Sequence, residues 1–562
     1  MLGSDILLNC LETHGVNTVF GMPGGVVLPL YDKLKNYPNL KHILTRHEQG
    51  AVHAADGYAR ATGEVGVCIV TSGPGAASIV TGVATANMDS VPIVCIVGQV
   101  VKPRRGKNGF QEPAMTGICQ STCKHTYSVT EASELPNILT EAFFVAKTGR
   151  PGPVLVEVPK DVLEEDAMVA YDSGSIRKRI VLKYKPCVVN REKVIKTGKM
   201  MKASKKPLLL IGGGINNQFS NDRVIYHIAE KAQIPVATTL MGRGVFPPGN
   251  EFDLGMAGTY GTKEANYAVK HCDLLIAIGV RFDERLTADV RGFAPHAKKI
   301  VHVDVDSSEV GKVVEVDCPI VVDGTEFINA LEDAVPECNH KNWIEEIAEQ
   351  KTEEKASRKT ALTVAETYKM IDSIIGDKTI VVTDAGQHQL WAAQLLHPKG
   401  PRKFITPGGL GTAGFGLPAA IGVQMGFPDH QVILVTGDGS LQKTMQELAT
   451  LKEQALCVKI CLINNRSLGF IRQLQKKDYD GNYEQTLPQF SPDWEKIAEA
   501  YDIPYFKIEK KAQCDKKLKK VLEGDACCLI DFQIDAEEEV ASVCLGEECL
   551  DDGWNGGTED EA

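Results

Sequence analysis

The stretch Gly437-Asp438-Gly439-Ser440, followed further along by Asn464-Asn465, decides the fold of this chain. Residues 431–436 (Gln-Val-Ile-Leu-Val-Thr) precede the first motif, and residues 457–463 (Cys-Val-Lys-Ile-Cys-Leu-Ile) precede the asparagine pair. Both runs are apolar and rich in β-branched residues, which is typical of buried parallel strands. Residues 445–451 between them have helical spacing. Because parallel strands end at the same edge of a sheet, this β-α-β unit predicts that Asp438 and Asn465 lie close together.

The chemistry of these side chains predicts a metal and a phosphate ligand. A carboxylate, an amide oxygen and a nearby backbone carbonyl are hard oxygen donors of the kind that Mg²⁺ prefers. Glycines and a helix N-terminus suit a diphosphate that the metal would bridge. Gly-Asp-Gly by itself can be a plain turn. Here a strand precedes each motif, and Asp438 and Asn465 stand 27 positions apart, a spacing that resembles the binding motif for thiamine diphosphate.

The composition excludes several classes of protein. The chain has 562 residues, of which 43% are hydrophobic and 24% are charged, and this predicts several globular domains. A net charge of −12 and the lack of a long basic run argue against nucleic acid as a partner. No apolar run reaches the ~18 residues that a membrane span needs. A helical pattern begins with the first residues, so we expect no signal or transit peptide.

The cysteines indicate a reducing environment. Sixteen of them are scattered along the chain, many inside apolar runs such as residues 67–69 and 94–96. No paired Cys-x-x-Cys set is present that would bind zinc. We therefore expect buried free thiols and a location in the cytoplasm.

Strands and helices alternate along most of the chain, which predicts an α/β fold of three doubly wound parallel-sheet domains. The first domain is expected over residues 1–165, with strands at 18–20, 41–44, 65–70, 92–97 and 152–158. The second is expected over 190–335, with strands at 207–211, 236–239, 274–278 and 300–305, and the third over 363–535. Similar alternation in the first and third domains suggests an old duplication.

The segments between and after these domains read as connectors. Residues 166–190 lack clear periodicity and predict a linker. The charged residues 339–359 predict an exposed helix or connector. Residues 536–562 predict an acidic, glycine-rich C-terminal tail.

Glu48 is the candidate for the second half of a thiamine diphosphate site. The coenzyme needs a carboxyl group beside a nitrogen of its aminopyrimidine ring. Glu48, in Arg46-His47-Glu48-Gln49-Gly50, follows the strand at 41–44 and opens a helix over 51–62. A glutamate at a helix N-terminus is commonly only a partner of the helix dipole. The motif in the third domain makes Glu48 the expected partner of the diphosphate site.

The chain resembles the superfamily of thiamine diphosphate-dependent decarboxylases and carboligases, and more narrowly the acetolactate (acetohydroxyacid) synthase catalytic subunits. The likeness runs in order along nearly the whole chain. It is carried by Gly21-Met22-Pro23-Gly24-Gly25, Arg46-His47-Glu48-Gln49-Gly50, Thr71-Ser72-Gly73-Pro74-Gly75, Phe110-Gln111-Glu112, Gly149-Arg150-Pro151-Gly152-Pro153-Val154, Thr238-Thr239-Leu240-Met241-Gly242, Gly279-Val280-Arg281-Phe282-Asp283, Gly386-Gln387-His388-Gln389-Leu390-Trp391 and Gly414-Phe415-Gly416-Leu417-Pro418.

The resemblance implies an activity and partners. It implies decarboxylation of pyruvate and carboligation to a second 2-oxo acid, giving 2-acetolactate for branched-chain amino acid biosynthesis. In this superfamily the site lies between two subunits, so a homodimer or homotetramer is implied. A small regulatory subunit is a further partner of such enzymes.

The resemblance also assigns roles to residues around the thiamine diphosphate and Mg²⁺. The side chains of Asp438 and Asn465 and the carbonyl of Ser467 would bind the metal. The residues around the diphosphate would be Gln387, His388, Gly439 and Ser440. Phe110 and Gln111 would line the substrate pocket, and Lys160 would lie near its mouth and attract a 2-oxo acid carboxylate. A solvated surface lysine is the alternative for Lys160.

The second domain resembles the FAD site of the same family. Gly212, Gly213 and Gly214 leave the strand at 207–211 without side chains, so that a ligand could approach the backbone. Asp304 ends a later strand, where an acid can bind a ribose hydroxyl. The resemblance adds Arg150, Thr239, Leu240, Arg281, Arg285 and Asp323. FAD would be structural there, and FAD-independent relatives are the alternative.

The acceptor pocket departs from the family pattern. Ala413 and Thr259 stand where methionines are usual, and Leu474 replaces a tryptophan. Gln442 and Lys443 stand where apolar side chains are common, and Asp478 replaces an aromatic residue. These changes leave two explanations besides drift in a working acetolactate synthase. One is acetyl transfer to a more polar carbonyl such as a keto-sugar. The other, which intact Glu48 and Asp438 oppose, is a weakly active structural homologue.

Overall fold

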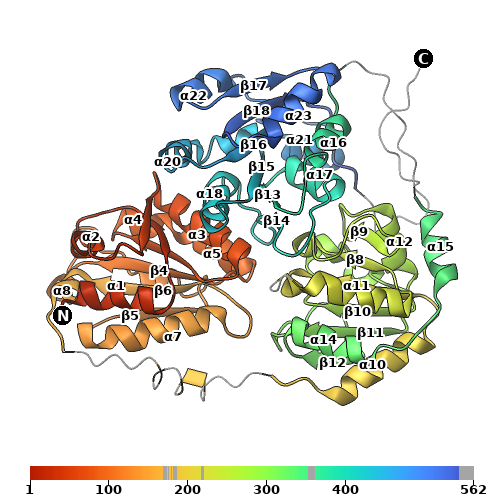
Figure 1. Ribbon diagram of the computed structural model, residues 1–562, viewed down its shortest axis with the longest axis horizontal. Helices are drawn as coiled ribbons and strands as arrows, with labels where there is room; N and C mark the ends of the chain where they lie inside the picture. The colour runs from red at the N-terminus through yellow and green to blue at the C-terminus, as the bar shows by residue number, and fades with distance from the viewer. Residues whose placement is uncertain are drawn as a thin grey trace.

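Three parallel sheets organise the chain, as Figure 1 shows. The computed structural model describes residues 1–168, 187–216, 220–351 and 361–542, and single positions between 174 and 181. The first domain is drawn in red to orange, the central domain in yellow to green and the third in teal to blue. Each sheet has six strands, and the pairs within each run parallel. The expected α/β class with three doubly wound sheets is confirmed.

The first sheet has helices on both faces. Its strands, in the order β2-β1-β3-β4-β6-β5, are β1 (Thr18–Gly21), β2 (Lys41–Leu44), β3 (Gly66–Val70), β4 (Ile93–Gln99), β5 (His125–Ser128) and β6 (Val154–Pro159). Its helices are α1 (Gly3–Thr13), α2 (Leu28–Leu34), α3 (Glu48–Thr62), α4 (Pro74–Ser78), α5 (Val80–Met88), α6 (Met115–Ile118), α7 (Leu135–Lys147) and α8 (Lys160–Glu164), with η1 (Lys102–Arg104) and η2 (Ala132–Glu134).

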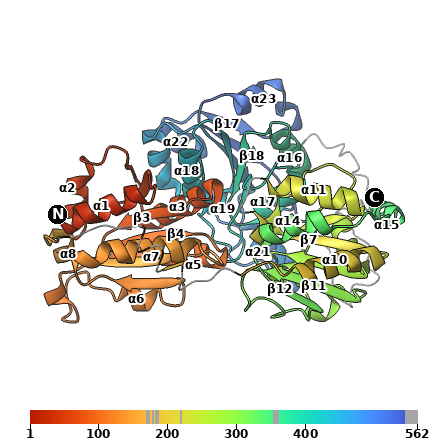
Figure 2. The same cartoon turned by 60° about the horizontal axis from the view of Figure 1, so that its bottom comes forward.

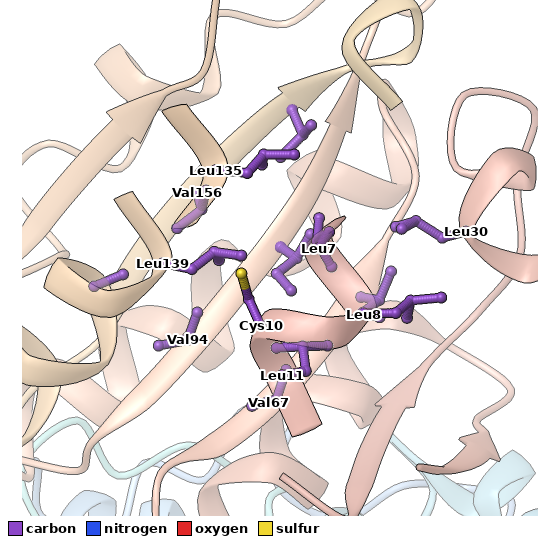
Figure 3. Close-up of a cluster of buried hydrophobic side chains, with 14 of the residues drawn as sticks. Leu7, Leu8, Cys10, Leu11, Leu30, Val67, Val94, Leu135, Leu139 and Val156 are labelled. Atoms are coloured by element: carbon purple, nitrogen blue, oxygen red, sulfur yellow. The ribbon is translucent and has the colours of Figure 1, made fainter. Parts of the chain in front are cut away.

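Alternation along the strands explains the two covered faces. Val67 belongs to the cluster formed with the leucines of α1 and α7, and Figure 3 shows it beside Leu11. Its neighbour Cys68 faces α3 and α5 on the other side. Because successive side chains of a strand point to opposite faces, an apolar strand needs a helix layer on each side.

The third sheet repeats the connectivity of the first. Its strands, in the order β14-β13-β15-β16-β18-β17, are β13 (Thr379–Thr383), β14 (Phe404–Ile405), β15 (Gln431–Gly437), β16 (Val458–Asn464), β17 (Tyr505–Ile508) and β18 (Cys528–Gln533). Its helices are α16 (Val364–Asp372), α17 (Gln387–Leu395), α18 (Gly416–Gly426), α19 (Asp438–Leu441), α20 (Leu448–Glu453), α21 (Gly469–Asp478), α22 (Trp494–Ala500) and α23 (Lys516–Glu523), with η6 (Met445–Glu447) and η7 (Lys511–Gln513). In both sheets the second strand comes first, followed by the first, third, fourth, sixth and fifth. This shared order agrees with the suggested duplication.

The helix expected over residues 445–451 is wrong in its extent. The chain forms the short helix α19, then the 3-10 turn η6 and then α20. The break at Glu447 turns its carboxylate toward the backbone amides of Arg46 and His47 in the first domain. A continuous helix would not present this side chain in the same way.

The central sheet has a different order, β12-β11-β10-β7-β8-β9. Its strands are β7 (Pro207–Ile211), β8 (Val236–Thr238), β9 (Asp253–Met256), β10 (Leu274–Ile278), β11 (Lys299–Asp304) and β12 (Cys318–Val321). Its helices are α10 (Arg191–Ala203), α11 (Asn221–Ala232), α12 (Lys263–His271), α13 (Glu284–Thr287) and α14 (Gly324–Ala334), with η3 (Gly213–Ile215), η4 (Leu240–Gly242) and η5 (Val290–Gly292). From β9 onward this is the order 3-2-1-4-5-6 of dinucleotide-binding sheets, whose crevice opens between the first and fourth strands, here β7 and β10.

The segment 339–359, expected as an exposed helix or connector, is partly buried against the central domain. α15 (Lys341–Ala348) packs its Trp343 against the central sheet, where that side chain is only 2% exposed. Trp343 also donates from Nε1 to the carbonyl of Pro207 at 3.1 Å. The expected linker at 166–190 lies largely outside the described residues, as do residues 352–360 and the expected tail beyond residue 542.

The first and third domains meet where α3 crosses α18. The two helices lie side by side in Figures 1 and 2. Glycines make the close crossing possible, because a Cβ on Gly57 would collide with the backbone of Ala419 and one on Gly422 with that of Ala54. This contact ties the start of α3, which carries Glu48, to the third domain.

Two expectations from composition can be compared with the described ranges. Their helices include none that is both long and apolar enough to cross a membrane. Their cysteines are all free thiols, most of them buried, as the sequence predicts.

Candidate active site

Two loops at the carboxyl edge of the third sheet carry the candidate metal ligands. Asp438 begins α19 directly after β15, and Asn465 directly follows β16. These two strands pair in parallel, so their carboxyl ends are neighbours. Asp438, Asn465 and Ser467 all line one cavity of about 900 Å³. The structure therefore brings together the three residues that the sequence assigns to a metal.

The donor set fits Mg²⁺. The carboxylate of Asp438 is 6% exposed, and burial raises its pKa to about 6. Asn465 is held by two hydrogen bonds of 3.1 Å, since its Nδ2 donates to Oε1 of Gln387 and its Oδ1 accepts the backbone N–H of Ser467. The described residues contain no group of three His, Cys, Asp or Glu that could hold a metal ion. A cation here would be bound by one carboxylate and neutral oxygens, which suits Mg²⁺ rather than zinc.

His388 presents an orphaned polar atom beside this loop. Its Nδ1 side bonds to the backbone carbonyl of Asp384, while Nε2 is buried and has no partner among the described atoms. Burial lowers its pKa to about 3. The ring fits between two glycines, because a Cβ on Gly386 would lie 2.7 Å from the ring and one on Gly437 2.8 Å from it. A phosphate oxygen against Nε2 would satisfy the orphaned nitrogen and favour its protonated form.

The remaining residues expected around the diphosphate share the cavity. Gln387 and His388 begin α17 after β13, which pairs with β15. β13 and β15 are the strands at which the order of this sheet reverses, the place where such sheets bind ligands. Gly439 and Ser440 line the same space from α19. These four residues and the metal donors therefore face one volume.

The same cavity continues to the central domain. Nine of the ten residues that the sequence assigns to FAD line it, namely Arg150, Gly213, Gly214, Thr239, Leu240, Arg281, Arg285, Asp304 and Asp323. Gly212 does not. The cavity thus joins the edge of the third sheet to the crevice between β7 and β10.

The glycines that follow β7 do more than let a ligand approach the backbone. A Cβ on Gly212 would collide with the carbonyl of Gly279, and one on Gly214 would lie 2.8 Å from the Cα of Gly279. Gly279 itself has a φ of +64°, in the left-handed region. The bare backbone therefore lets the loops after β7 and β10 pack on each other. Gly213 and Gly214 face the cavity as a consequence of this packing.

Carboxylates and Arg150 line the central end of the cavity. Asp304 ends β11, and burial raises its pKa to about 6. Asp323 caps α14 by accepting the backbone N–H of Thr325 at 2.9 Å. Arg150, from the first domain, forms ion pairs with Asp306 at 3.4 Å and Glu309 at 2.9 Å. Acids at the ends of strands in such a sheet suit the ribose hydroxyls of a dinucleotide.

Glu48 and Gln111 lie together at the edge of the first sheet. Glu48 is the first residue of α3, and a Cβ on Gly75 would lie 2.7 Å from its Oε1. Gln111 has a positive φ of +60° and packs against Gly73. Phe110 beside it is 81% exposed. None of these three candidates lines the large cavity, so within one chain they do not share it with the metal donors.

Lys160 stands away from the other candidates. It begins α8, and its ammonium lies 3.6 Å from Glu164 in a half-exposed ion pair. It lines a separate shallow pocket with Leu2 and Leu28 rather than the large cavity. This setting agrees with the alternative of a solvated surface lysine.

The sequence reasoning missed two features of the site. Glu447 is fully buried and binds the loop before Glu48; a carboxylate among helix-spaced apolar residues is the signal that could have shown it. Arg285 lies over the rings of Tyr260 and Phe470, with its guanidinium carbon 5.7 and 5.4 Å from their centroids. No local sequence pattern indicates that Arg285 lies over these two rings, because Tyr260, Arg285 and Phe470 are far apart in the sequence.

Comparison with known proteins agrees with this geometry. Three families described as thiamine pyrophosphate enzyme domains match the chain, the N-terminal TPP binding domain over residues 1–118, the central domain over 194–331 and the C-terminal TPP binding domain over 384–532. A probable acetolactate synthase large subunit of Methanocaldococcus jannaschii is 41% identical, with 97% of this chain and 94% of that protein covered. The acetolactate synthase large subunit of Lactococcus lactis is 40% identical, with 96% and 93% covered. The chloroplastic acetolactate synthase 1 of Nicotiana tabacum is 40% identical, with 96% and 82% covered.

Proposed function

The chain belongs to the thiamine pyrophosphate enzymes, among the acetolactate synthase large subunits, and from that premise we propose how its own residues perform the reaction. It is a thiamine diphosphate-dependent acetolactate synthase, which joins two molecules of pyruvate into 2-acetolactate and releases CO₂. The alternative of a polar acceptor such as a keto-sugar is not favoured, because the likeness to relatives with this name covers nearly the whole chain.

The proposal rests on the orphaned Nε2 of His388 and the buried carboxylate of Asp438, which face one cavity. Thiamine diphosphate, when bound, supplies a carbon nucleophile and takes up the electron pair left when CO₂ departs. Asp438, Asn465 and the carbonyl of Ser467 would hold Mg²⁺ against its diphosphate. Gln387, His388, Gly439 and Ser440 would bind the diphosphate oxygens.

Glu48 would act on the coenzyme from a second copy of the chain. Its carboxyl would hold a proton at a nitrogen of the aminopyrimidine ring and so set the tautomer of that ring. Gln111 packs on Gly73 and Glu48 on nearby Gly75, and Gln111 with the exposed Phe110 would line the space for pyruvate. Because Glu48 lies outside the cavity that holds Asp438, a homodimer would complete each site with residues of both chains.

FAD would occupy the central end of the cavity. The strand order of the central sheet and the crevice between β7 and β10 support this proposal. The acids Asp304 and Asp323 would bind ribose hydroxyls, and Arg281 would face the diphosphate of the dinucleotide. FAD would be structural, since the reaction needs no net electron transfer. Absorbance of the purified protein near the flavin bands tests its presence.

The activity is tested by product analysis and by mixing subunits. Pyruvate, Mg²⁺ and thiamine diphosphate should yield CO₂ and 2-acetolactate, and both Glu48→Gln and Asp438→Asn should abolish the yield. When these two inactive variants are mixed and allowed to exchange subunits, a shared site should restore about a quarter of wild-type activity, because half of the dimers then hold one intact site. No recovery after proven exchange would contradict the shared site.

The words "large subunit" in the relatives' names also support a smaller regulatory partner, which co-purification from the source cell would reveal.

A further inference from the structure

One cationic side chain in the large cavity makes no direct ion pair with the residues that the structure describes. Seven lysines and arginines line this cavity within the described part of the chain. Six of them have partners there: Arg60 with Asp56 and Asp89, Lys147 with Glu64, Arg150 with Asp306 and Glu309, Arg281 with the carbonyl of Met88, Arg285 with two aromatic rings, and Arg402 with the carbonyl of Arg60. The ammonium of Lys443 forms no ion pair and no side-chain hydrogen bond with a described residue, and its charge acts from a longer distance on the buried carboxylate of Asp384. It is therefore available to an anionic ligand.

The backbone places Lys443 next to the turn that carries Asp438 and Ser440, at the wall of the cavity. Its N–H donates to the carbonyl of Ser440 at 3.1 Å, which continues the turn that begins at Asp438. Its stem lies against Gly414, where an added Cβ would be 2.9 Å from the Cβ of Lys443. The hydroxyl of Thr444 donates to the carbonyl of Gly414 at 2.9 Å and holds the two segments together.

The neighbour of Gly414 leaves room for this lysine. Ala413 precedes Gly414 and lines the cavity with a single methyl group. The family that the sequence resembles usually has methionine at this position. Lys443 stands where an apolar side chain is expected. The stem of the lysine can therefore lie along the cavity wall while its ammonium faces the cavity.

The possible anions are the two carboxylates of the reaction and the diphosphate of the coenzyme. A cation that pairs with the carboxylate of the first pyruvate would stabilise the group that must leave as CO₂, and so would raise the barrier to decarboxylation. The second, acceptor pyruvate keeps its carboxylate throughout. A cation that binds it lowers the cost of bringing a second anion into the site and orients its keto carbon for attack.

We propose that Lys443 binds the carboxylate of the acceptor 2-oxo acid. The inference rests on the proposed function, because it names a substrate contact in that site. It makes Lys443 a specificity residue for acidic acceptors, in a position where the expected apolar residue could offer only van der Waals contact.

The test compares three variants of the holoenzyme. Lys443→Met removes the charge and keeps an unbranched stem, and Lys443→Arg restores the charge. Lys452→Met is the matched control, because Lys452 is an exposed lysine of the same domain that pairs with Asp502 at 2.6 Å. For Lys443→Met we expect the KM for pyruvate in acetolactate formation to rise about ten- to hundredfold, the range typical for loss of a charged hydrogen bond. The ratio of acetaldehyde to acetolactate should rise, since the two-carbon unit that finds no acceptor leaves as acetaldehyde. Lys443→Arg should recover most of both values.

Two binding measurements complete the test. Oxamate, an unreactive carboxylate analogue of pyruvate, should bind to Lys443→Met at least tenfold more weakly than to the wild type by calorimetry. Quenching of tryptophan fluorescence should show unchanged affinity for Mg²⁺ and thiamine diphosphate. Weaker binding of the coenzyme would show that Lys443 serves the diphosphate and would overturn the inference, and so would unchanged oxamate affinity. A wild-type protein that releases no CO₂ would refute the proposed function, and the oxamate titration would still decide the role of Lys443.

Discussion

Replacing Glu447 by alanine would show how strongly the third domain holds the loop that carries Glu48. The carboxylate of Glu447 is fully buried and accepts the N–H of Arg46 at 2.9 Å, the N–H of His47 at 3.0 Å and the hydroxyl of Thr450 at 2.8 Å. Alanine leaves the two backbone N–H donors without their acceptor, at a cost of about 1 kcal/mol or more each, whereas the hydroxyl of Thr450 also reaches the carbonyl of Leu44 at 3.1 Å. We therefore expect the free energy of unfolding to fall by about 2 kcal/mol or more.

The same change should affect catalysis, because His47 directly precedes Glu48. A loop that loses two amide anchors no longer fixes the start of α3, and a displacement of about 1 Å at a catalytic group can lower the rate about a hundredfold. We expect kcat for CO₂ release at saturating coenzyme to fall at least about tenfold.

The control for Glu447 is Glu453→Ala. Glu453 belongs to α20 in the same region and, among the described residues, pairs only with the partly exposed side chain of Arg46, at 2.5 Å. An exposed pair of this kind contributes less than about 1 kcal/mol. Urea denaturation measures stability, and release of CO₂ from pyruvate measures kcat. The reasoning would be refuted by a Glu447→Ala protein whose unfolding free energy and kcat match those of Glu453→Ala.

Three further predictions address the metal, the domain contact and the pH dependence. Asp438→Asn should abolish the Mg²⁺-dependent binding of thiamine diphosphate in calorimetry while flavin absorbance remains, and a retained metal dependence would contradict the assignment. Gly422→Ala places a Cβ against the carbonyl of Ala54 and should lower the unfolding free energy by about 1–3 kcal/mol, whereas Gly117→Ala, which meets open space, should not. Burial raises the pKa of Asp384 to about 6, above its ordinary value of 3.8. The contribution of the protonated carboxyl to stability is therefore complete below pH 3.8 and is lost as the pH rises through 6. We expect Asp384→Asn to flatten the fall of the urea denaturation midpoint between these pH values. The same fall in the variant as in the wild type would contradict this prediction.

The first and third sheets share one strand order but carry different candidate site residues at corresponding edges. Both sheets reverse their order between corresponding strands, β1 and β3 in one and β13 and β15 in the other. The third domain carries Asp438 and His388 at that edge. The first domain instead presents Glu48, at the start of the helix that follows β2. Two related edges can thus meet one coenzyme from opposite sides.

The sequence by itself determined the class of the fold and indicated which residues form the candidate metal loop. Strands such as β2, β7 and β10 have the bounds that their apolar runs predict. Asp438 and Asn465 could be paired because each directly follows a buried strand, and parallel pairing brings such ends together. Strands with little apolar content, such as β5 (His-Thr-Tyr-Ser), were not indicated, since hydrophobic pattern is the signal that such predictions use.

Only the tertiary structure decided how these parts act on one another. The anchor between Glu447 and the loop before Glu48 joins residues 400 positions apart, and no local pattern specifies such a pair. The packing of Gly212 on Gly279, and the absence of a direct ion pair to Lys443 among the described residues, likewise depend on what the folded chain brings near them. The physical reason is that apolar periodicity records whether a residue is buried, whereas hydrogen bonds, charges and close backbone contacts depend on which residue it is buried against.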